Sequence, residues 1–169
     1  MIRPAGPDDA PGIRAVHLAA FPTAAEANLV EALGRDNASV VSLVAENHCE
    51  IVGHVLLSRM TASGDRVVFR ALGLAPVAVR PGFQGGKIGS RLIEGALAIA
   101  RATGEELVFV LGEPDYYRRF GFSAATAAPF ASLYAGPYFM AHQLRSDLAL
   151  PASGTAAYAS AFADLGDGA

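Results

Sequence analysis

The chain has 169 residues, a length typical of one domain with its own hydrophobic core. Hydrophobic residues form 52% of the sequence and charged residues 17%, which excludes an intrinsically disordered chain, and the net charge of −3 argues against general nucleic-acid binding. No run approaches the roughly 20 apolar residues that would span a membrane, and the first residues lack the apolar core that a signal peptide would have. A single cysteine, Cys49, excludes an intramolecular disulfide. We therefore expect a cytoplasmic protein that does not bind a membrane.

Residues 2–5 form a candidate strand at the start of the chain. Asp8 or Asp9 can cap the helix that follows. A second helix is predicted after Thr23, because Thr23 and Glu26 have the spacing of a capping box. The chain is thus expected to open with a strand and two helices.

Three valine-rich segments then predict strands over residues 39–45, 51–60 and 66–79, with a hairpin turn at 46–48 between the first two. Gly73 and Pro76 interrupt the third strand. Because proline cannot donate to a strand ladder and glycine within a strand often marks a bulge, we expect this strand to bend or to splay from a neighbour.

The second half of the chain alternates helical and strand patterns. The predicted elements are a helix that begins at 88 and ends near 103–104, a buried strand over 107–111, a short helix over 116–120, a strand that begins at 120–122 and a last strand over 138–144. We expect one domain over residues 1–150. Residues 151–169 are small and polar, which predicts a tail on the surface, in part mobile.

Positive charge is concentrated in one stretch of the chain. Five cations and no acid lie between Arg66 and Ile93, whereas the rest of the chain carries 8 cations and 16 acids. A basic island in an acidic chain indicates a local anionic ligand, although a chance cluster of solvated side chains would give the same pattern.

Within this stretch, residues 72–97 read as a strand, a glycine-rich loop and a helix, an arrangement that can hold a phosphate at the helix N-terminus. The P-loop pattern of NTPases fails, because it needs glycine at Pro81 and serine or threonine at Ile88. The dinucleotide pattern fails because its first glycine falls on Gln84. Two interpretations of the loop remain: an anion site of another kind, or an ordinary glycine-rich turn.

Two segments of the chain match one family. The first reads VAVRP over residues 77–81, followed by Gln84 and Gly89. The second reads LVFVLGEPDYYRRFGF over residues 107–122. Together they resemble the GNAT superfamily of N-acetyltransferases, with its Gln/Arg-x-x-Gly-x-Gly/Ala loop and its Tyr-x-x-x-Gly-Phe segment. The combination is similar to a YhbS-like subgroup, and the resemblance covers about residues 2–150.

The resemblance implies an α/β (α+β) fold of GNAT type. Its sheet would be mixed but mostly antiparallel, with six to seven strands, splayed at residues 77–79 and covered by helices on both faces. It also implies an N-acetyltransferase that transfers an acetyl group from acetyl-CoA to a primary amine by direct attack. The alternative is a non-catalytic acyl-CoA-binding or regulatory module with the same fold.

The resemblance also assigns the site residues. Tyr117 aligns with the tyrosine that protonates the CoA thiolate. The family's first loop glycine falls on Lys87, which has less freedom at positive φ than glycine. The residues expected to bind the cosubstrate are Val77, Ala78, Val79, Gln84, Gly85, Gly86, Lys87, Ile88, Gly89 and Ser90.

A general base is not evident from the sequence. The candidates by residue type alone are Glu26, Glu31, Glu113, His54 and His142. The four histidines lack the spacing of metal ligands, so we expect no metal. The acceptor amine is not identified; the two N-terminal helices and residues 123–136 would read it, and the uncharged composition of that segment favours a small or apolar-flanked amine. A homodimer is compatible with the sequence.

Overall fold

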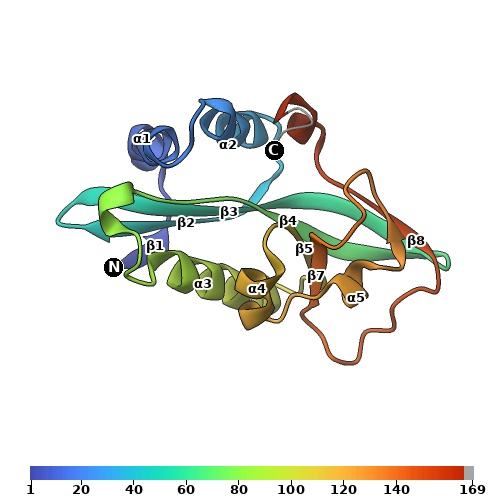
Figure 1. The fold of residues 1–169 in the computed structure, drawn as a ribbon. Coiled ribbons are helices and arrows are strands. Elements are labelled where there is room, and N and C mark those ends of the chain that lie inside the picture. The colour runs from blue at the N-terminus through green and yellow to red at the C-terminus, as the bar shows by residue number, and fades with distance from the viewer. Residues whose placement is uncertain (166–169) are drawn as a thin grey trace. The chain divides into compact units, whose positions relative to one another are not determined.

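The computed structural model describes residues 1–165, and its strands form an eight-stranded sheet (Figure 1). The strand order is β1-β2-β3-β4-β5-β7, with β8 beside β3 and β6 beside β8. The β4–β5 and β6–β8 pairs are parallel, and the pairs β1–β2, β2–β3, β3–β8 and β5–β7 are antiparallel. The predicted fold class, a mixed and mostly antiparallel sheet with helices, is confirmed.

Contacts divide the chain into two compact units. The first comprises Met1–Ser58, Ala75–Ala98 and the chain from Ser160, and the second comprises Arg59–Leu74 and Ile99–Ala159. Two strands run through both units, β3 (Glu50–Gly64) and β4 (Val67–Val79). None of the helices within residues 1–165 is long and apolar enough to cross a membrane.

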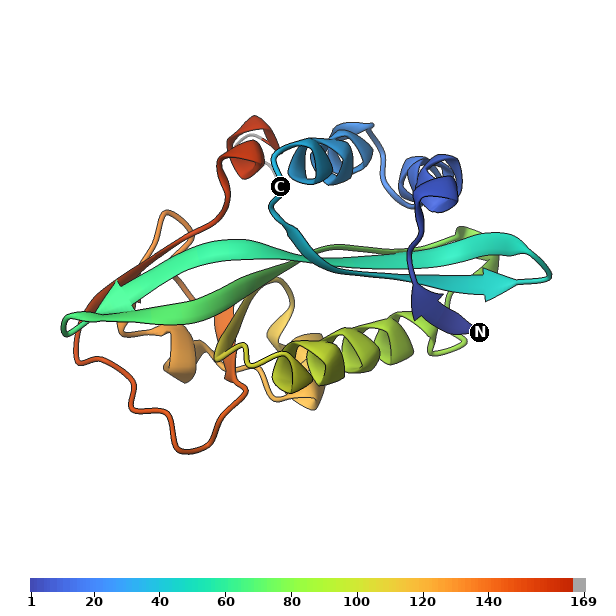
Figure 2. The ribbon, with the colours of Figure 1, turned by 180° about the vertical axis from the view of Figure 1, so that it is seen from behind.

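The first unit places helices on both faces of its strands (Figures 1 and 2). Its other elements are β1 (Ile2–Pro4), α1 (Ala10–Ala20), α2 (Ala25–Arg35), β2 (Ser39–Asn47) and most of α3 (Ile88–Ala102). Helix α3 packs closely on β3, because a Cβ at Gly53 would lie 3.0 Å from both Ile88 and Leu92. This contact holds the N-terminal turn of α3 against the sheet.

Two local features of the first unit depart from the sequence prediction. The hairpin forms one residue later than expected, with His48 and Cys49 both at positive φ, the conformation of a type I′ turn. The capping box at Thr23 does not form. The Thr23 hydroxyl accepts a hydrogen bond from the amide of Ala25 at 3.3 Å, and Oε2 of Glu26 is buried without a hydrogen-bond partner.

The second unit is built around an aromatic core. Its other elements are β5 (Leu107–Leu111), α4 (Pro114–Tyr117), α5 (Ala124–Ala127), β6 (Phe130–Ala131), β7 (Phe139–Gln143) and β8 (Gly154–Ala157). The Phe109 ring lies 5.3 Å from the rings of both Phe130 and Phe139, measured between centroids. The strand predicted to begin at 120–122 does not form there: Ser123 forms one isolated bridge to Ala141 and then caps α5.

The β4–β5 pair in the second unit is short. It joins Ala71–Gly73 to Leu107–Phe109, and within the described residues of this unit it does not extend to Leu74. The ladder therefore ends at Gly73, ahead of the 77–79 stretch at which we predicted the sheet to splay. Tyr158 packs directly on Gly73, since a Cβ there would lie 2.7 Å from Cε1 of Tyr158.

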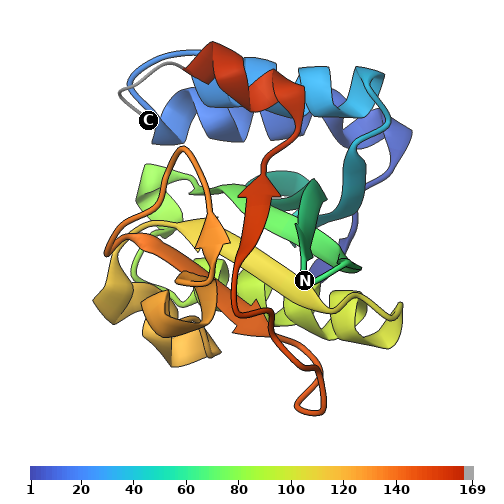
Figure 3. The same ribbon diagram turned by 90° about the vertical axis from the view of Figure 1, so that its right-hand side faces the viewer.

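The segment expected as a surface tail is largely structured. Strand β8 pairs with Thr61–Gly64 of β3 and lies beside β6 (Figure 3). Ser160–Leu165 forms a 3₁₀ helix that packs against α2 and buries Ala161 and Phe162. The short sequence of β8 lacks an alternating hydrophobic pattern, so its pairing with a distant strand could not be predicted.

Because Phe162 is only 6% exposed, we expect Phe162→Leu to lower the free energy of unfolding by about 1 kcal/mol. Ala163→Ser, at an exposed neighbour, should change it by no more than about 0.5 kcal/mol. Urea unfolding followed by circular dichroism measures both variants. Equal stability of the two would show that the segment behaves as a tail.

Candidate active site

The loop that follows β4 lies in the first unit and is anchored to the end of that strand. The side-chain amide of Gln84 donates to the carbonyl oxygen of Val79 at 3.0 Å. On the other side of the strand end, the amide of Arg80 donates to the carbonyl of Val52 at 2.9 Å. Gln84, which is predicted to contact the cosubstrate, thus also anchors the loop to the end of β4.

Two of the loop residues before α3 have a left-handed backbone conformation. Gly85 has φ of 82° and Lys87 has φ of 64°, both in the left-handed region. The amide of Arg91 donates to the carbonyl of Lys87 at 3.0 Å, in the i→i−4 pattern of the helix. The amides of residues 88–90 belong to the first turn, where no helical acceptor exists, and so they can bind an anion at the positive end of the helix dipole.

Lys87 therefore takes the conformation that the family's glycine would favour. A non-glycine residue in the left-handed region is strained by about 1–2 kcal/mol. Replacement by glycine removes this strain, but the greater entropy of glycine in the unfolded chain offsets part of the gain in stability. We expect Lys87→Gly to raise the free energy of unfolding by about 0.5–1 kcal/mol. Lys87→Ala, which removes the same charge but keeps a Cβ, should give no such gain. Thermal unfolding compares them, and equal stability of the two variants would refute the strain.

Ion pairs neutralise part of the basic island. Arg80 pairs with Glu50, and Arg70 lies 2.9 Å from the buried carboxylate of Glu105. Within residues 1–165, Lys87 forms no ion pair. The ammonium group of Lys87 is therefore the cation in the loop that remains available to an anionic ligand.

Tyr117 lies in the second unit, at the end of α4. Its ring covers Gly112 so closely that a Cβ there would lie 2.5 Å from Cε2 of Tyr117. The rings of Tyr116 and Phe122 pack edge-on against it, at centroid distances of 5.0 Å and 5.9 Å. Burial, with a smaller contribution from Tyr116, raises the pKa of Tyr117 to about 12. The hydroxyl is consequently a donor at neutral pH.

Two further tyrosines lie near Tyr117 in the same unit. The Tyr134 and Tyr158 rings meet edge-on at 5.5 Å. Burial first, and then the hydroxyls of Tyr134 and Tyr117, raise the pKa of Tyr158 above its usual range. Sequence reasoning missed Tyr158 as part of this group, because it lies in the segment interpreted as a tail.

Two of the candidate bases are histidines already engaged by their neighbours. His54 is fully buried, with Nδ1 2.8 Å from Nε2 of His17 and Nε2 2.9 Å from the hydroxyl of Ser42. Nδ1 of His142 lies 3.0 Å from the carbonyl oxygen of Gly121, to which it can donate. Burial lowers the pKa of both histidines.

The carboxylate candidates are no better placed than the histidines to act as a general base. Glu31 accepts a hydrogen bond from Arg14 at 3.0 Å, and Glu113 stands at the N-cap of α4. None of these contacts singles out one candidate as the general base. Among residues 1–165, no three histidine, cysteine, aspartate or glutamate side chains are grouped so that they could hold a metal ion.

Comparison with known proteins decides the family. The family described as "Acetyltransferase (GNAT) domain" matches residues 1–125. The chain belongs to the GNAT acetyltransferase family. The resemblance drawn from residues 77–89 and 107–122 is thereby confirmed, together with the enzyme class that it implied.

Relatives of this GNAT protein include two from Escherichia coli K12. It is 32% identical to the uncharacterized N-acetyltransferase YhbS over 150 residues, which cover 87% of this chain and 89% of YhbS. It is 40% identical to the uncharacterized N-acetyltransferase YjhQ over 116 residues, which cover 68% of this chain but only 64% of YjhQ.

Two solved GNAT structures are similar over nearly the whole chain. The E. coli YhbS structure in complex with CoA has a TM-score of 0.87 and 30% identity, covering 96% of this chain and 91% of YhbS. A GNAT acetyltransferase from Brucella melitensis in complex with acetyl-CoA has a TM-score of 0.79 and 34% identity, covering 96% and 97%.

Proposed function

We propose that the protein is an acetyl-CoA-dependent N-acetyltransferase that acetylates a primary amine. The observation that carries this proposal is the loop before α3, in which Gly85 and Lys87 are left-handed and lead into the first turn of the helix. The similar YhbS and Brucella structures contain CoA or acetyl-CoA, which is the kind of pyrophosphate ligand that such a loop can hold.

The proposed cosubstrate site has two parts in the first unit. The amides of residues 85–90 would hold the pyrophosphate, with the ammonium of Lys87 as an added counter-charge. The backbone of residues 77–79 would pair with pantetheine as an extra strand, as a strand edge can with an extended ligand. The Val79 carbonyl already accepts from Gln84, so Val77 and Ala78 are the better candidates for this pairing.

In the proposed reaction the amine nitrogen attacks the thioester carbonyl carbon. A C–N bond forms, the C–S bond breaks and its electron pair leaves on sulfur, while the nitrogen loses a proton to solvent. Tyr117 acts as general acid by directing its hydroxyl proton at the sulfur atom as negative charge develops there. Its pKa of about 12 keeps the Tyr117 hydroxyl protonated at neutral pH, so the hydroxyl can donate a hydrogen bond to the sulfur as negative charge develops there. Because an ordinary thiol has a pKa of about 8.5, this hydrogen bond stabilises the leaving thiolate without complete proton transfer.

This pKa predicts the alkaline side of the pH profile. An ordinary tyrosine would lose its proton near about pH 10, whereas Tyr117 keeps it until about pH 12. We expect kcat to show no decline from Tyr117 ionisation between about pH 8 and pH 10. Initial rates, corrected for spontaneous thioester hydrolysis, provide the measurement. A decline centred in that range and absent from Tyr117→Phe would contradict the assignment.

The acceptor is a small amine in this proposal, and neither nucleic acid nor membrane takes part; the cytoplasm remains the expected location. The test supplies acetyl-CoA with a panel of primary amines and measures free thiol and acetylated amine. We expect the two products in equal amounts with at least one amine. Measurable CoA binding without thiol release from any amine would instead favour the non-catalytic acyl-CoA-binding module.

A further inference from the structure

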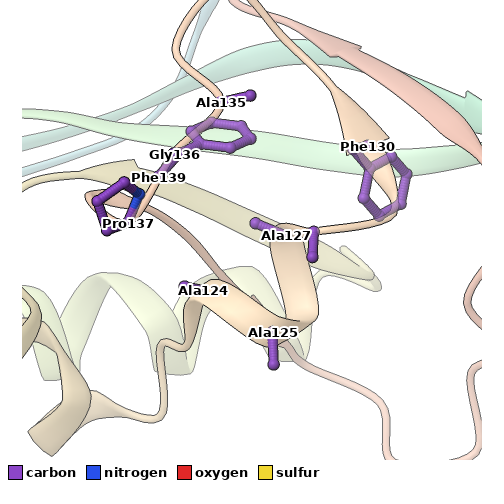
Figure 4. Close-up of a pocket in the computed structure, with 9 residues that line it drawn as sticks. Ala124, Ala125, Ala127, Phe130, Ala135, Gly136, Pro137 and Phe139 are labelled. Carbon is purple, nitrogen blue, oxygen red and sulfur yellow. The ribbon is translucent and has the colours of Figure 1, made fainter.

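The second unit contains a cavity of about 450 Å³ beside α5 (Figure 4). Four alanines between positions 124 and 128, the rings of Phe130 and Phe139, and residues 135–137 line it. All of these lining residues are alanine, glycine, proline or phenylalanine. None of their side chains can form a hydrogen bond or carry a charge, so the cavity favours a hydrocarbon group.

The cavity lies beside the segment that carries Tyr117. Its wall residue Phe139 is paired with Leu111 in the β5–β7 ladder. The carbonyl of the preceding residue, Tyr138, accepts from the amide of Gly112 at 3.0 Å, and the Tyr117 ring covers Gly112. Phe139 of the cavity wall therefore lies opposite Leu111, and the ring of Tyr117 packs on the next residue, Gly112.

From these contacts we infer that the cavity binds the hydrocarbon part of the acceptor, and that the substrate class is an amine on an aliphatic or arylalkyl chain without a second charge. This inference rests on the proposed function, since it names the acceptor of the same reaction. The volume lies in the range of small-ligand sites, about 300–1,000 Å³. The small alanine side chains keep this space open where larger residues would fill it.

The lining predicts a dependence on chain length. Each methylene moved from water into the cavity stabilises the bound acceptor by about 0.8 kcal/mol, or about fourfold. From n-propylamine to n-hexylamine, kcat/KM is expected to rise by up to about fourfold per methylene. A diamine of the same length should lose this gain, because its distal ammonium would give up hydration beside side chains that offer it no partner. A kcat/KM that is independent of chain length, or equal for amine and diamine, would overturn the inference.

Ala128→Phe tests the cavity itself, because it places a large ring among the lining residues. We expect kcat/KM for n-hexylamine to fall to the value for n-propylamine, while the KM for acetyl-CoA is unchanged. Ala131→Phe is the matched control, since Ala131 is exposed, close in sequence and outside the lining. Equal losses with both amines in Ala128→Phe, or the same selective loss in Ala131→Phe, would contradict the assignment.

Binding without turnover separates this inference from the proposed function. n-Hexylamine is titrated into the ¹⁵N-labelled protein without acetyl-CoA, and saturable amide shifts are expected in residues 124–139. If these shifts occur but no amine is acetylated, the proposed function fails and the hydrocarbon site stands. If no shifts occur in this segment, the site is refuted even where acetylation is observed.

Discussion

Tyr117→Phe is expected to lower kcat for acetyl transfer by about 10²–10³-fold, with a much smaller change in the Kd for CoA. The variant keeps the ring, and so keeps its contacts with Gly112 and Phe122, but it lacks the hydroxyl that faces the leaving sulfur in the proposed reaction. Steady-state kinetics with a saturating amine give kcat, and isothermal titration gives the Kd.

Tyr116→Phe is the matched control for this loss. Its ring packs against Tyr117 at 5.0 Å, so both variants remove one hydroxyl from the same short helix. Its kcat should stay within about threefold of the wild type, because no role at the sulfur is assigned to it. Unchanged turnover in Tyr117→Phe, or equal losses in the two variants, would remove Tyr117 from the mechanism.

Acid is expected to destabilise the first unit through the buried pair His17 and His54. Both side chains are fully buried, and their ring nitrogens lie 2.8 Å apart. Burial lowers the pKa of His17 to about 4. Burial, together with the neighbouring His17, lowers the pKa of His54 to about 3. Neither ring can accept a proton without leaving a charge inside the core.

The sign of the pH effect follows from these pKa values. Each folded pKa lies below the unfolded value of about 6.5, so the pair's contribution is present above about pH 6.5 and is lost as the pH falls toward the folded values. From pH 7 to pH 5 the free energy of unfolding should fall by on the order of 4 kcal/mol.

Urea unfolding at several pH values between these limits measures this loss. The double variant His17→Gln/His54→Gln should lose most of the pH dependence, whatever its stability at pH 7. His48→Gln, at an exposed histidine in the β2–β3 turn, should retain it. An unchanged acid slope in the double variant would show that other groups control acid unfolding.

Local sequence patterns predicted the parts of the candidate site that depend on local structure. The loop before α3 and the Tyr117 segment each follow from a short run of residues, and the strand-loop-helix order around Lys87 is as expected. The left-handed φ of Lys87 could not be read from the sequence, since lysine disfavours this conformation.

Features that depend on distant contacts were missed. Strand β8 forms by pairing with residues of β3 that lie ninety or more positions earlier, and its own short sequence carries little signal. Tyr158, which follows β8, was missed for the same reason. His17 and His54 are likewise joined only by the fold. The uncharged composition of residues 123–136 favoured a small or apolar-flanked amine, but the cavity lined by this segment could not be predicted because it also depends on Phe139.

The most direct test of the account is a crystal structure of this protein with CoA. We expect the pyrophosphate oxygens to accept hydrogen bonds from the amides of residues 85–90 and the sulfur atom to lie within hydrogen-bond distance of the Tyr117 hydroxyl. A pyrophosphate bound away from this loop, or a sulfur atom out of reach of Tyr117, would contradict it.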